Sequence, residues 1–184
     1  RAGSCVLPLH DPVRIAEEWA VVDNLSNGRA SIAFASGWTV DDFVLAKDSH
    51  ANRKVNLWKG VDIVKKLWQG EAVERQDANG KSFTIKTLPK PIQAELPIWM
   101  TCQSNETFME AGKLGTNVLT SLLTGTLDVI VTKIKLYRKQ REKHGHDPES
   151  GKVSLMIHTF LGDDINTVKE KVRRPFCNYL KTHY

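Results

Sequence analysis

The stretch that decides the fold runs from residue 97 to residue 117 and reads PIWMTCQSNETFMEAGKLGTN. A short apolar run ends in small polar residues, and a helical pattern begins at once. This order predicts a buried strand followed directly by a helix that starts near Asn105. Ser104 would then lie at the helix N-cap, where its hydroxyl can accept a hydrogen bond from the N–H of Thr107. The remaining N–H groups at the helix start favour an anion such as phosphate, although an ordinary capped helix would show the same residues.

Four further apolar runs alternate with helical patterns along the chain. They are near-continuous in hydrophobicity, as expected for parallel strands that are covered on both faces. Together with the run at 97–101, they predict strands at residues 4–9, 30–35, 117–123 and 153–161. The patterns between them predict helices from 12 to 25, from 53 to 69, from 105 onward, from 127 to 143 and from 164 to 181. Pro175 is expected to bend or break the last helix, because its ring removes a hydrogen bond and crowds the preceding turn.

A β-hairpin insertion is predicted near residues 71–87. The sequence AVERQDANGKSFTI alternates on both sides of Ala78-Asn79-Gly80, which favours a tight turn between two strands. With the hairpin set aside, strands and helices alternate along the chain. This order predicts a parallel α/β fold, either doubly wound or part of a (β/α) barrel.

Composition limits the class of protein. The chain has 184 residues, of which 41% are hydrophobic and 26% charged, so we expect one globular domain over residues 1–184. No apolar stretch is long enough to span a membrane, and no membrane partner is expected. Cys5, Cys102 and Cys177 form no C-x-x-C pair, which argues against a metal site and favours a reducing, cytoplasmic compartment.

The net charge of +5 raises the question of nucleic acid. Most of the clustered positive charge lies in residues 133–145, where Lys133, Lys135, Lys139 and Arg141 fall largely outside an apolar helical stripe. A solvated helix face explains this pattern. The sequence has no recognised nucleic-acid motif, so no nucleic-acid partner is expected.

Three stretches together resemble the luciferase-like, flavin-dependent monooxygenase family. They are residues 1–38, 88–123 and 135–164, and the block AEEWAVVDNLSNGR at 16–29 is fairly specific. The first and third are most similar to the branch associated with peptide and polyketide assembly lines. The family fold is a (β/α)8 barrel of the TIM type, for which about 250 residues is typical. The resemblance implies that this chain supplies the central portion, about strands three to seven, with the hairpin as an insertion.

The resemblance also assigns residues to the phosphate end of a flavin. Ser104 and Thr107 match positions that hold the flavin phosphate in bacterial luciferase, and Gln103 stands where that enzyme has a glutamate. Arg53 matches an arginine that reaches the same phosphate, a role that suits its charge-assisted hydrogen bonds. From the sequence alone, Arg53 could equally be a surface arginine at a helix start.

A second set of residues is implied beside the flavin ring. Cys5 and Val6 align with a strand bulge that carries a non-prolyl cis peptide in several relatives. Ala35, Ser36 and Gly37 match the junction that flanks the isoalloxazine. Luciferase has cysteine and arginine where this chain has Ala35 and Ser36, so any contact that needs that arginine is not expected here.

Histidines are the candidates for acid–base chemistry. His10 ends the first expected strand on the presumed active edge and is the catalytic candidate in this chain. A structural role is the alternative, because Asp11 is expected to cap the following helix. His158 lies within an expected apolar strand and is interpreted as a core histidine.

The resemblance implies an FMN-dependent monooxygenase that inserts one oxygen atom from O2 into an organic substrate. The FMN would arrive reduced from a partner flavin reductase, since no nicotinamide site is recognised. The substrate could be tethered to a carrier protein in natural-product biosynthesis, and the partners would include an assembly-line synthase or a second copy in a homodimer. Two alternatives stay open: a deazaflavin-dependent oxidoreductase of the same fold, and a non-catalytic remnant or structural module of a larger synthase.

Overall fold

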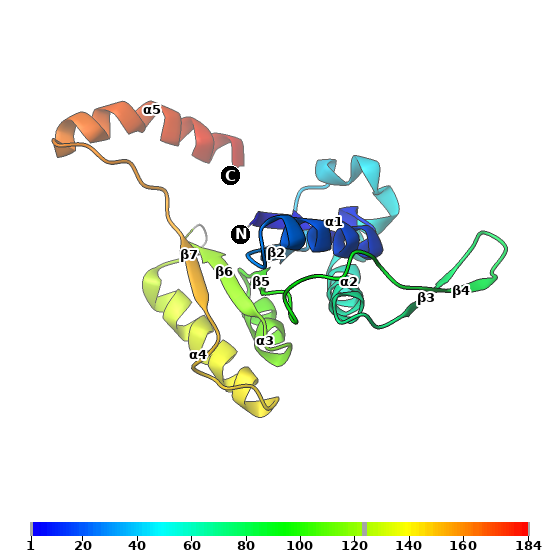
Figure 1. Ribbon diagram of the computed structural model, residues 1–184. Coiled ribbons are helices and arrows are strands. Elements are labelled where there is room, and N and C mark those ends of the chain that lie inside the picture. The colour runs from blue at the N-terminus through cyan, green and yellow to red at the C-terminus, as the bar shows by residue number, and fades with distance from the viewer. Residues whose placement is uncertain (1, 123–124, 184) are drawn as a thin grey trace.

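The computed structural model describes residues 2–122 and 125–183, and five parallel strands form its main sheet. The strand order is β1-β2-β5-β6-β7 (Figure 1). The strands are Ala2–Val6 (β1), Ile32–Ala35 (β2), Ile98–Thr101 (β5), Asn117–Ser121 (β6) and Val153–Met156 (β7). Each strand of this sheet pairs with the next one along the chain, whereas a doubly wound sheet reverses its order. The fold is therefore α/β of the barrel type, and the five strands form an open portion of an eight-stranded barrel.

Helices α1 to α4 cover one face of the sheet. The longer helices are Pro12–Leu25 (α1), Arg53–Trp68 (α2), Asn105–Lys113 (α3), Leu127–Lys143 (α4) and Ile165–His183 (α5). Short 3-10 helices occupy Leu7–Leu9 (η1), Asp41–Leu45 (η2) and Lys47–Ser49 (η3). Within the described residues, none of these helices has the length and apolar character needed to cross a membrane.

The hydrophobic core lies between the sheet and helices α1 to α4. Phe34 and Met100 from the strands pack there with Val64 of α2, Phe108 of α3 and Tyr137 of α4, and all five are buried. Because side chains alternate along a strand, the neighbouring residues face the opposite side of the sheet. Hydrogen bonds join strands on that side, from Trp99 Nε1 to Ser154 Oγ at 3.2 Å and between the hydroxyls of Ser4 and Thr101 at 2.7 Å.

The insertion between α2 and β5 is an antiparallel hairpin. Its strands are Val73–Gln76 (β3) and Ser82–Ile85 (β4), which form a separate two-stranded sheet. The carboxylate of Asp77 closes the turn by accepting the backbone N–H groups of Asn79 and Lys81. Val73 packs against Ala16 of α1 and Leu67 of α2, so the hairpin lies on the helices and not on the main sheet.

Two strand boundaries differ from the prediction. The first strand ends at Val6 and not at residue 9, because Pro8 has no N–H for a sheet ladder and sits in the 3-10 turn η1. The last strand ends at Met156 and not at residue 161. Met156 pairs with Ser121, the last residue of β6, so the chain beyond it has no neighbouring strand on that side.

The interpretation of His158 as a core histidine is wrong. The residue lies after β7 and is exposed. Its ring contacts the rings of Phe176 and Tyr179 on α5, with centroids 5.4 and 5.0 Å apart. These contacts connect α5 to the extended segment that leads to it, while α5 itself lies apart from the sheet (Figure 1).

Helix α5 continues through Pro175, so the expected break does not occur. Proline at this position cannot donate a hydrogen bond to the carbonyl of Lys171, one turn earlier. Both residues are exposed, and water can hydrate that carbonyl. An exposed helix therefore tolerates the proline better than a packed one would.

Arg141 on α4 is buried, which corrects the prediction of a solvated face at this position. Only 5% of the residue is exposed. Its guanidinium donates to the carbonyls of Asp147 and Thr116 and to the hydroxyl of Ser150. Residues 147–151 fold back over the end of α4 and supply most of these acceptors. The helical pattern could not indicate a loop that covers the arginine.

Asp23 on α1 is a fully buried carboxylate that anchors the segment before β5. Its Oδ2 accepts the backbone N–H groups of Ile92 and Gln93 at 2.8 and 2.9 Å, and its Oδ1 accepts the side-chain amide of Gln93 at 2.7 Å. Burial by itself would raise the pKa of Asp23, but these hydrogen bonds outweigh burial and hold the pKa below its usual value. The ionised carboxylate therefore stabilises the fold.

We predict that Asp23→Asn lowers the free energy of unfolding by about 2–3 kcal/mol near neutral pH, because the amide cannot accept all three hydrogen bonds. A carboxyl group with a lowered folded pKa stabilises above its unfolded pKa of about 3.9, and this contribution is lost as the pH falls through the folded value. The gap between wild type and variant should thus shrink below about pH 4 in urea titrations. Asp42→Asn, at an exposed position, is the control and should change little; an equal effect of both variants would contradict the anchor.

Candidate functional site

The carboxyl ends of the five parallel strands lie at one edge of the sheet, which we call the carboxyl edge (Figure 1). Helices α2, α3 and α4 begin after this edge. In barrels of this type, binding sites form from the loops at the carboxyl ends of the strands. Most of the residues predicted from the sequence for a site lie in these loops, at the ends of β1, β2 and β5.

The junction between β5 and α3 has the expected capped geometry. Ser104 has extended backbone angles (φ −90°, ψ 159°), and its Oγ accepts the N–H of Thr107 at 3.3 Å. The Thr107 hydroxyl donates in turn to the Ser104 carbonyl at 2.9 Å. The N–H groups of Asn105 and Glu106 have no partner in the helical ladder, because a helix cannot satisfy its own first donors. These groups point outward from the carboxyl edge.

Gln103, immediately before the cap, is fixed through three of its polar groups. Its backbone N–H donates to Thr107 Oγ1 at 3.2 Å, and its side-chain amide donates to Ser121 Oγ at the end of β6 at 2.8 Å. Its carbonyl accepts from Lys133 Nζ on α4 at 2.6 Å. The junction is thereby held against both β6 and α4.

Lys133 is the residue at this junction that sequence reasoning missed. The charged run was predicted to be a solvated face, and for Lys133 that prediction is wrong, because the residue is half-buried and bonded to Gln103. Lys133 lies in the second turn of α4, which begins at the carboxyl edge. A helical pattern shows the face on which a lysine lies but not how far its side chain reaches, so the sequence carried no usable signal.

Arg53 is the first residue of α2 and lies beside the loop that follows β2. Its Nε donates to the Gly37 carbonyl at 3.3 Å and its Nη1 to the His50 carbonyl at 3.1 Å. In the described part of the chain, its Nη2 makes no hydrogen bond. An ion pair between Lys54 and Glu106, at 2.8 Å, joins the first turns of α2 and α3. We refer to Arg53, Gln103, Ser104 and Thr107 as the β5–α3 corner.

Gly37 forms a tight turn after β2 and has a positive φ of 75°. A Cβ atom at this position would lie 2.8 Å from atoms of both Phe43 and Val6. Phe43 is buried beneath this loop, and Ser36 donates its hydroxyl to the Gly37 carbonyl at 3.3 Å. The Ala35-Ser36-Gly37 turn therefore presents backbone and small side chains at the carboxyl edge.

Cys5 faces the helices and packs against the hydrophobic core. Burial, with a smaller contribution from the charge of Glu18, raises the pKa of the Cys5 thiol to about 11. Burial likewise raises the pKa of Cys102 to about 12, although a hydrogen bond to Thr107 acts in the opposite direction. Both thiols are therefore protonated at neutral pH and unsuited to nucleophilic chemistry.

The cis peptide implied at Cys5–Val6 is absent, which corrects that expectation. The cis peptide bond of the described chain is Leu88–Pro89, a prolyl bond. The irregularity in the pairing of β1 with β2 lies between Ala2 and Ser4, before the expected bulge. Val6 still contributes to the carboxyl edge, since it lies against the Gly37 turn.

His10 is exposed and follows the 3-10 turn η1. Its backbone N–H donates to the Leu7 carbonyl at 2.9 Å, and no hydrogen bond of its ring is seen within residues 2–122 and 125–183. Its neighbour Asp11 caps α1 by accepting the N–H of Val13 at 2.8 Å and also pairs with Arg75 at 3.2 Å. Asp11 thus has the structural role that was the alternative, and His10 has no contact that ties it to the β5–α3 corner among the described residues.

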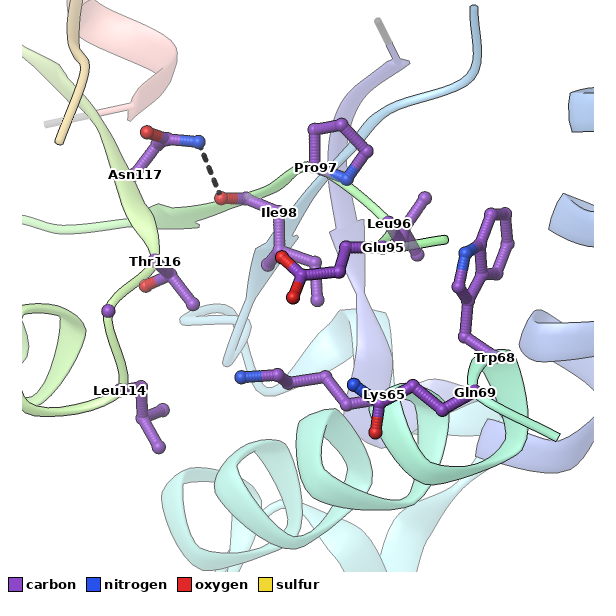
Figure 2. Close-up of a pocket in the computed structure, with 11 residues that line it drawn as sticks. Lys65, Trp68, Gln69, Glu95, Leu96, Pro97, Ile98, Leu114, Thr116 and Asn117 are labelled. Carbon is purple, nitrogen blue, oxygen red and sulfur yellow. Dashed lines mark hydrogen bonds between the residues drawn. The ribbon is translucent and has the colours of Figure 1, made fainter. Parts of the chain in front are cut away.

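A cavity of about 200 Å³ lies at the opposite, amino edge of the sheet. Figure 2 shows Lys65 and Trp68 of α2 on one side and Ile98, Thr116 and Asn117 from the starts of β5 and β6 on the other. In barrels of this type, residues at the amino edge usually contribute to stability and not to chemistry. The described residues contain no cluster of three metal-ligating side chains there or elsewhere. The carboxyl edge is therefore the stronger candidate site.

A family model described as luciferase-like monooxygenase matches residues 1–184. The chain is 28% identical over 186 residues to the alkanal monooxygenase alpha chain of Photobacterium leiognathi, which covers 97% of this chain and 49% of that protein. It is 27% identical over 169 residues to the oxygenase component of a flavin-dependent trigonelline monooxygenase of Acinetobacter baylyi. That alignment covers 88% of this chain and 45% of the relative. The chain spans about half the length of these curated relatives.

Solved structures share the fold at lower identity. A monooxygenase from Streptomyces bottropensis gives a TM-score of 0.79 at 22% identity, over 94% of this chain and 53% of that one. A type II Baeyer–Villiger monooxygenase of Pseudomonas putida in complex with FMN gives a TM-score of 0.75 at 16% identity. The match covers 92% of this chain and 50% of that one. An F420-dependent secondary alcohol dehydrogenase gives a TM-score of 0.66 at 18% identity, and the match covers 89% of this chain and 50% of that one. At these identities the likeness shows the fold alone.

We predict that Gly37→Ala destabilises the chain by at least about 2 kcal/mol more than Gly80→Ala, because only the first adds overlap with packed atoms to backbone strain. Gly80 has a similar φ of 80°, but open space surrounds it in the hairpin turn. Urea unfolding of both variants measures the difference. Equal losses of unfolding free energy would mean that the turn can move away from Phe43 and Val6, and that the carboxyl edge is less rigid than the structure indicates.

Proposed function

The chain belongs to the luciferase-like monooxygenase family, and from this premise we propose that it carries the cofactor-binding part of an FMN-dependent monooxygenase. The observation that carries the proposal is the β5–α3 corner, where a helix start capped by Ser104 opens at the carboxyl edge of a barrel sheet beside Arg53. A helix N-terminus with unsatisfied N–H groups attracts a phosphate through both hydrogen bonds and the helix dipole.

Charge supports a phosphate at this corner. Arg53 uses two of its nitrogens to hold the loops after β2 and before α2, which leaves Nη2 for a ligand oxygen. Glu106 is the acidic residue in the first turn of α3, and Lys54 neutralises it at 2.8 Å. The local balance is therefore positive, as a phosphate dianion requires.

The flavin ring is proposed to lie against the Ala35-Ser36-Gly37 turn and the end of β1 at Cys5 and Val6. Cys5 would contribute its backbone only, because its side chain packs against the core. Small side chains and exposed backbone let a flat ring approach closely. When bound and reduced, FMN supplies the reaction with O2 and the transfer of one oxygen atom. The residues of this chain hold the phosphate, orient the ring and help to keep water from it.

Partners and substrate follow from the same family assignment. We propose that a separate flavin reductase supplies reduced FMN. The Acinetobacter baylyi relative is the oxygenase component of its monooxygenase, which supports such a two-component system. The substrate is proposed to be an organic molecule, tethered to a carrier protein in natural-product biosynthesis. The similarity of residues 1–38 and 135–164 to the assembly-line branch supports that choice.

A deazaflavin-dependent oxidoreductase is the second candidate function. It is favoured by the shared fold with an F420-dependent secondary alcohol dehydrogenase. Such an enzyme transfers hydride and does not consume O2. Oxygen uptake that depends on reduced FMN and substrate, measured on the full-length protein, separates the two candidates. A folded chain that binds neither cofactor would instead indicate a structural module.

We predict that Ser104→Asp binds FMN at least about tenfold more weakly than Ser104→Asn, because an added charge near the phosphate opposes it. Both substitutes are good N-cap residues, so both variants should keep α3 folded. Riboflavin lacks the phosphate and should bind the two variants equally. Fluorescence quenching of each flavin gives the dissociation constants. FMN affinities that match in the two variants would contradict a phosphate at Ser104.

We also predict that Arg53→Met weakens FMN binding by about tenfold, since a charge-assisted hydrogen bond to a phosphate oxygen is lost. Arg29→Met is the matched control, because Arg29 is exposed on the loop between α1 and β2 and, among the described residues, forms its side-chain hydrogen bond with Ser26. Riboflavin titrations accompany both variants. A loss for FMN that equals the loss for riboflavin would assign Arg53 to loop structure and not to the phosphate.

A further inference from the structure

Lys133 reaches the β5–α3 corner from a different helix than Arg53. Its Nζ lies 2.6 Å from the Gln103 carbonyl, the residue directly before the Ser104 cap. The α3 and α4 helices pack closely, so the lysine stem crosses from the second turn of α4 to the start of α3. The ammonium group is therefore held at Gln103, two residues before the first of the backbone donors that would bind a phosphate.

The charge of Lys133 is not matched by an acidic partner. Among the described residues no carboxylate lies within ion-pair distance of its Nζ, and its hydrogen-bond partner is the neutral Gln103 carbonyl. An ammonium has N–H donors beyond the one used in this bond. A half-buried cation without a counter-ion favours an anion next to it more strongly than a solvated one does.

We propose that Lys133 is a positioning and specificity-determining residue that directs this site to a phosphorylated flavin in preference to riboflavin. The inference rests on the proposed function and extends it. Lys133 would fix the Gln103 carbonyl, and thereby the first turn of α3, while its positive charge attracts the phosphate. Arg53 on the α2 side and Lys133 on the α4 side would then flank the phosphate from opposite neighbours of β5.

The other lysines near this corner have different surroundings. Lys54 forms an ion pair with Glu106. Lys135 lies two residues beyond Lys133 on the same helix but is exposed, with no ion pair to another described residue. Lys135 thus offers a matched control of the same charge on the same helix.

The test compares Lys133→Met, Lys133→Arg and Lys135→Met in this chain. Inorganic phosphate is titrated while the backbone amide signals of residues 103–107 are followed by NMR, and FMN and riboflavin are titrated by fluorescence quenching. For Lys133→Met we expect phosphate and FMN affinities to fall by about tenfold, from the loss of one charge-assisted bond, with riboflavin changed less than about twofold. Lys133→Arg should restore most of the preference, and Lys135→Met should match the wild type.

The outcomes separate the two claims. If the wild type prefers FMN over riboflavin and Lys133→Met keeps that ratio, the role of Lys133 is overturned while the proposed function stands. In particular, if Lys133→Met weakens the binding of FMN and of riboflavin by the same factor, the role of Lys133 is structural and the inference fails. If phosphate leaves the amides of residues 103–107 unchanged and the wild type has no preference for FMN, the proposed function and this inference both fall.

Discussion

Parallel pairing of β5 between β2 and β6 is the constraint on which the candidate site depends. It brings the ends of three strands to one edge, so the Gly37 turn, Gln103 and Ser121 all lie at that edge although they are far apart in sequence. The hydrogen bond from Gln103 to Ser121 exists only because β6 ends beside β5. The same arrangement starts α2 and α3 side by side, where the pair of Lys54 and Glu106 joins them.

Local sequence rules predicted an interaction correctly where its two partners lie within a few residues of each other. The apolar run at residues 97–101, followed by small polar residues, located the end of β5 and the start of α3. The Ser104 cap was predicted because its partner Thr107 is three residues away, and the structure has that hydrogen bond. The cap of Asp11 on α1 was predicted for the same reason and is also present. The hairpin turn at 78–80 likewise depends on neighbouring residues alone.

Prediction failed where the partner is distant in the sequence or absent. Strand β7 stops at Met156 because its neighbour β6 stops, which an apolar run up to residue 161 cannot reveal. Arg141 and Lys133 were assigned to solvent because the loop over one and the Gln103 carbonyl near the other are set by tertiary packing. His158 was assigned to a strand that ends before it. These errors share one cause, since periodicity predicts the face of an element but not what lies opposite.

The central claim is that the carboxyl edge at the β5–α3 corner, and not the cavity at the amino edge, receives the phosphate of FMN. Amide hydrogen–deuterium exchange of the chain with and without FMN tests it most directly. The account predicts slower exchange in residues 103–108, with little change in residues 65–69 and 114–117 around the cavity. Protection confined to the cavity residues, or no protection of the α3 start by saturating FMN, would contradict it.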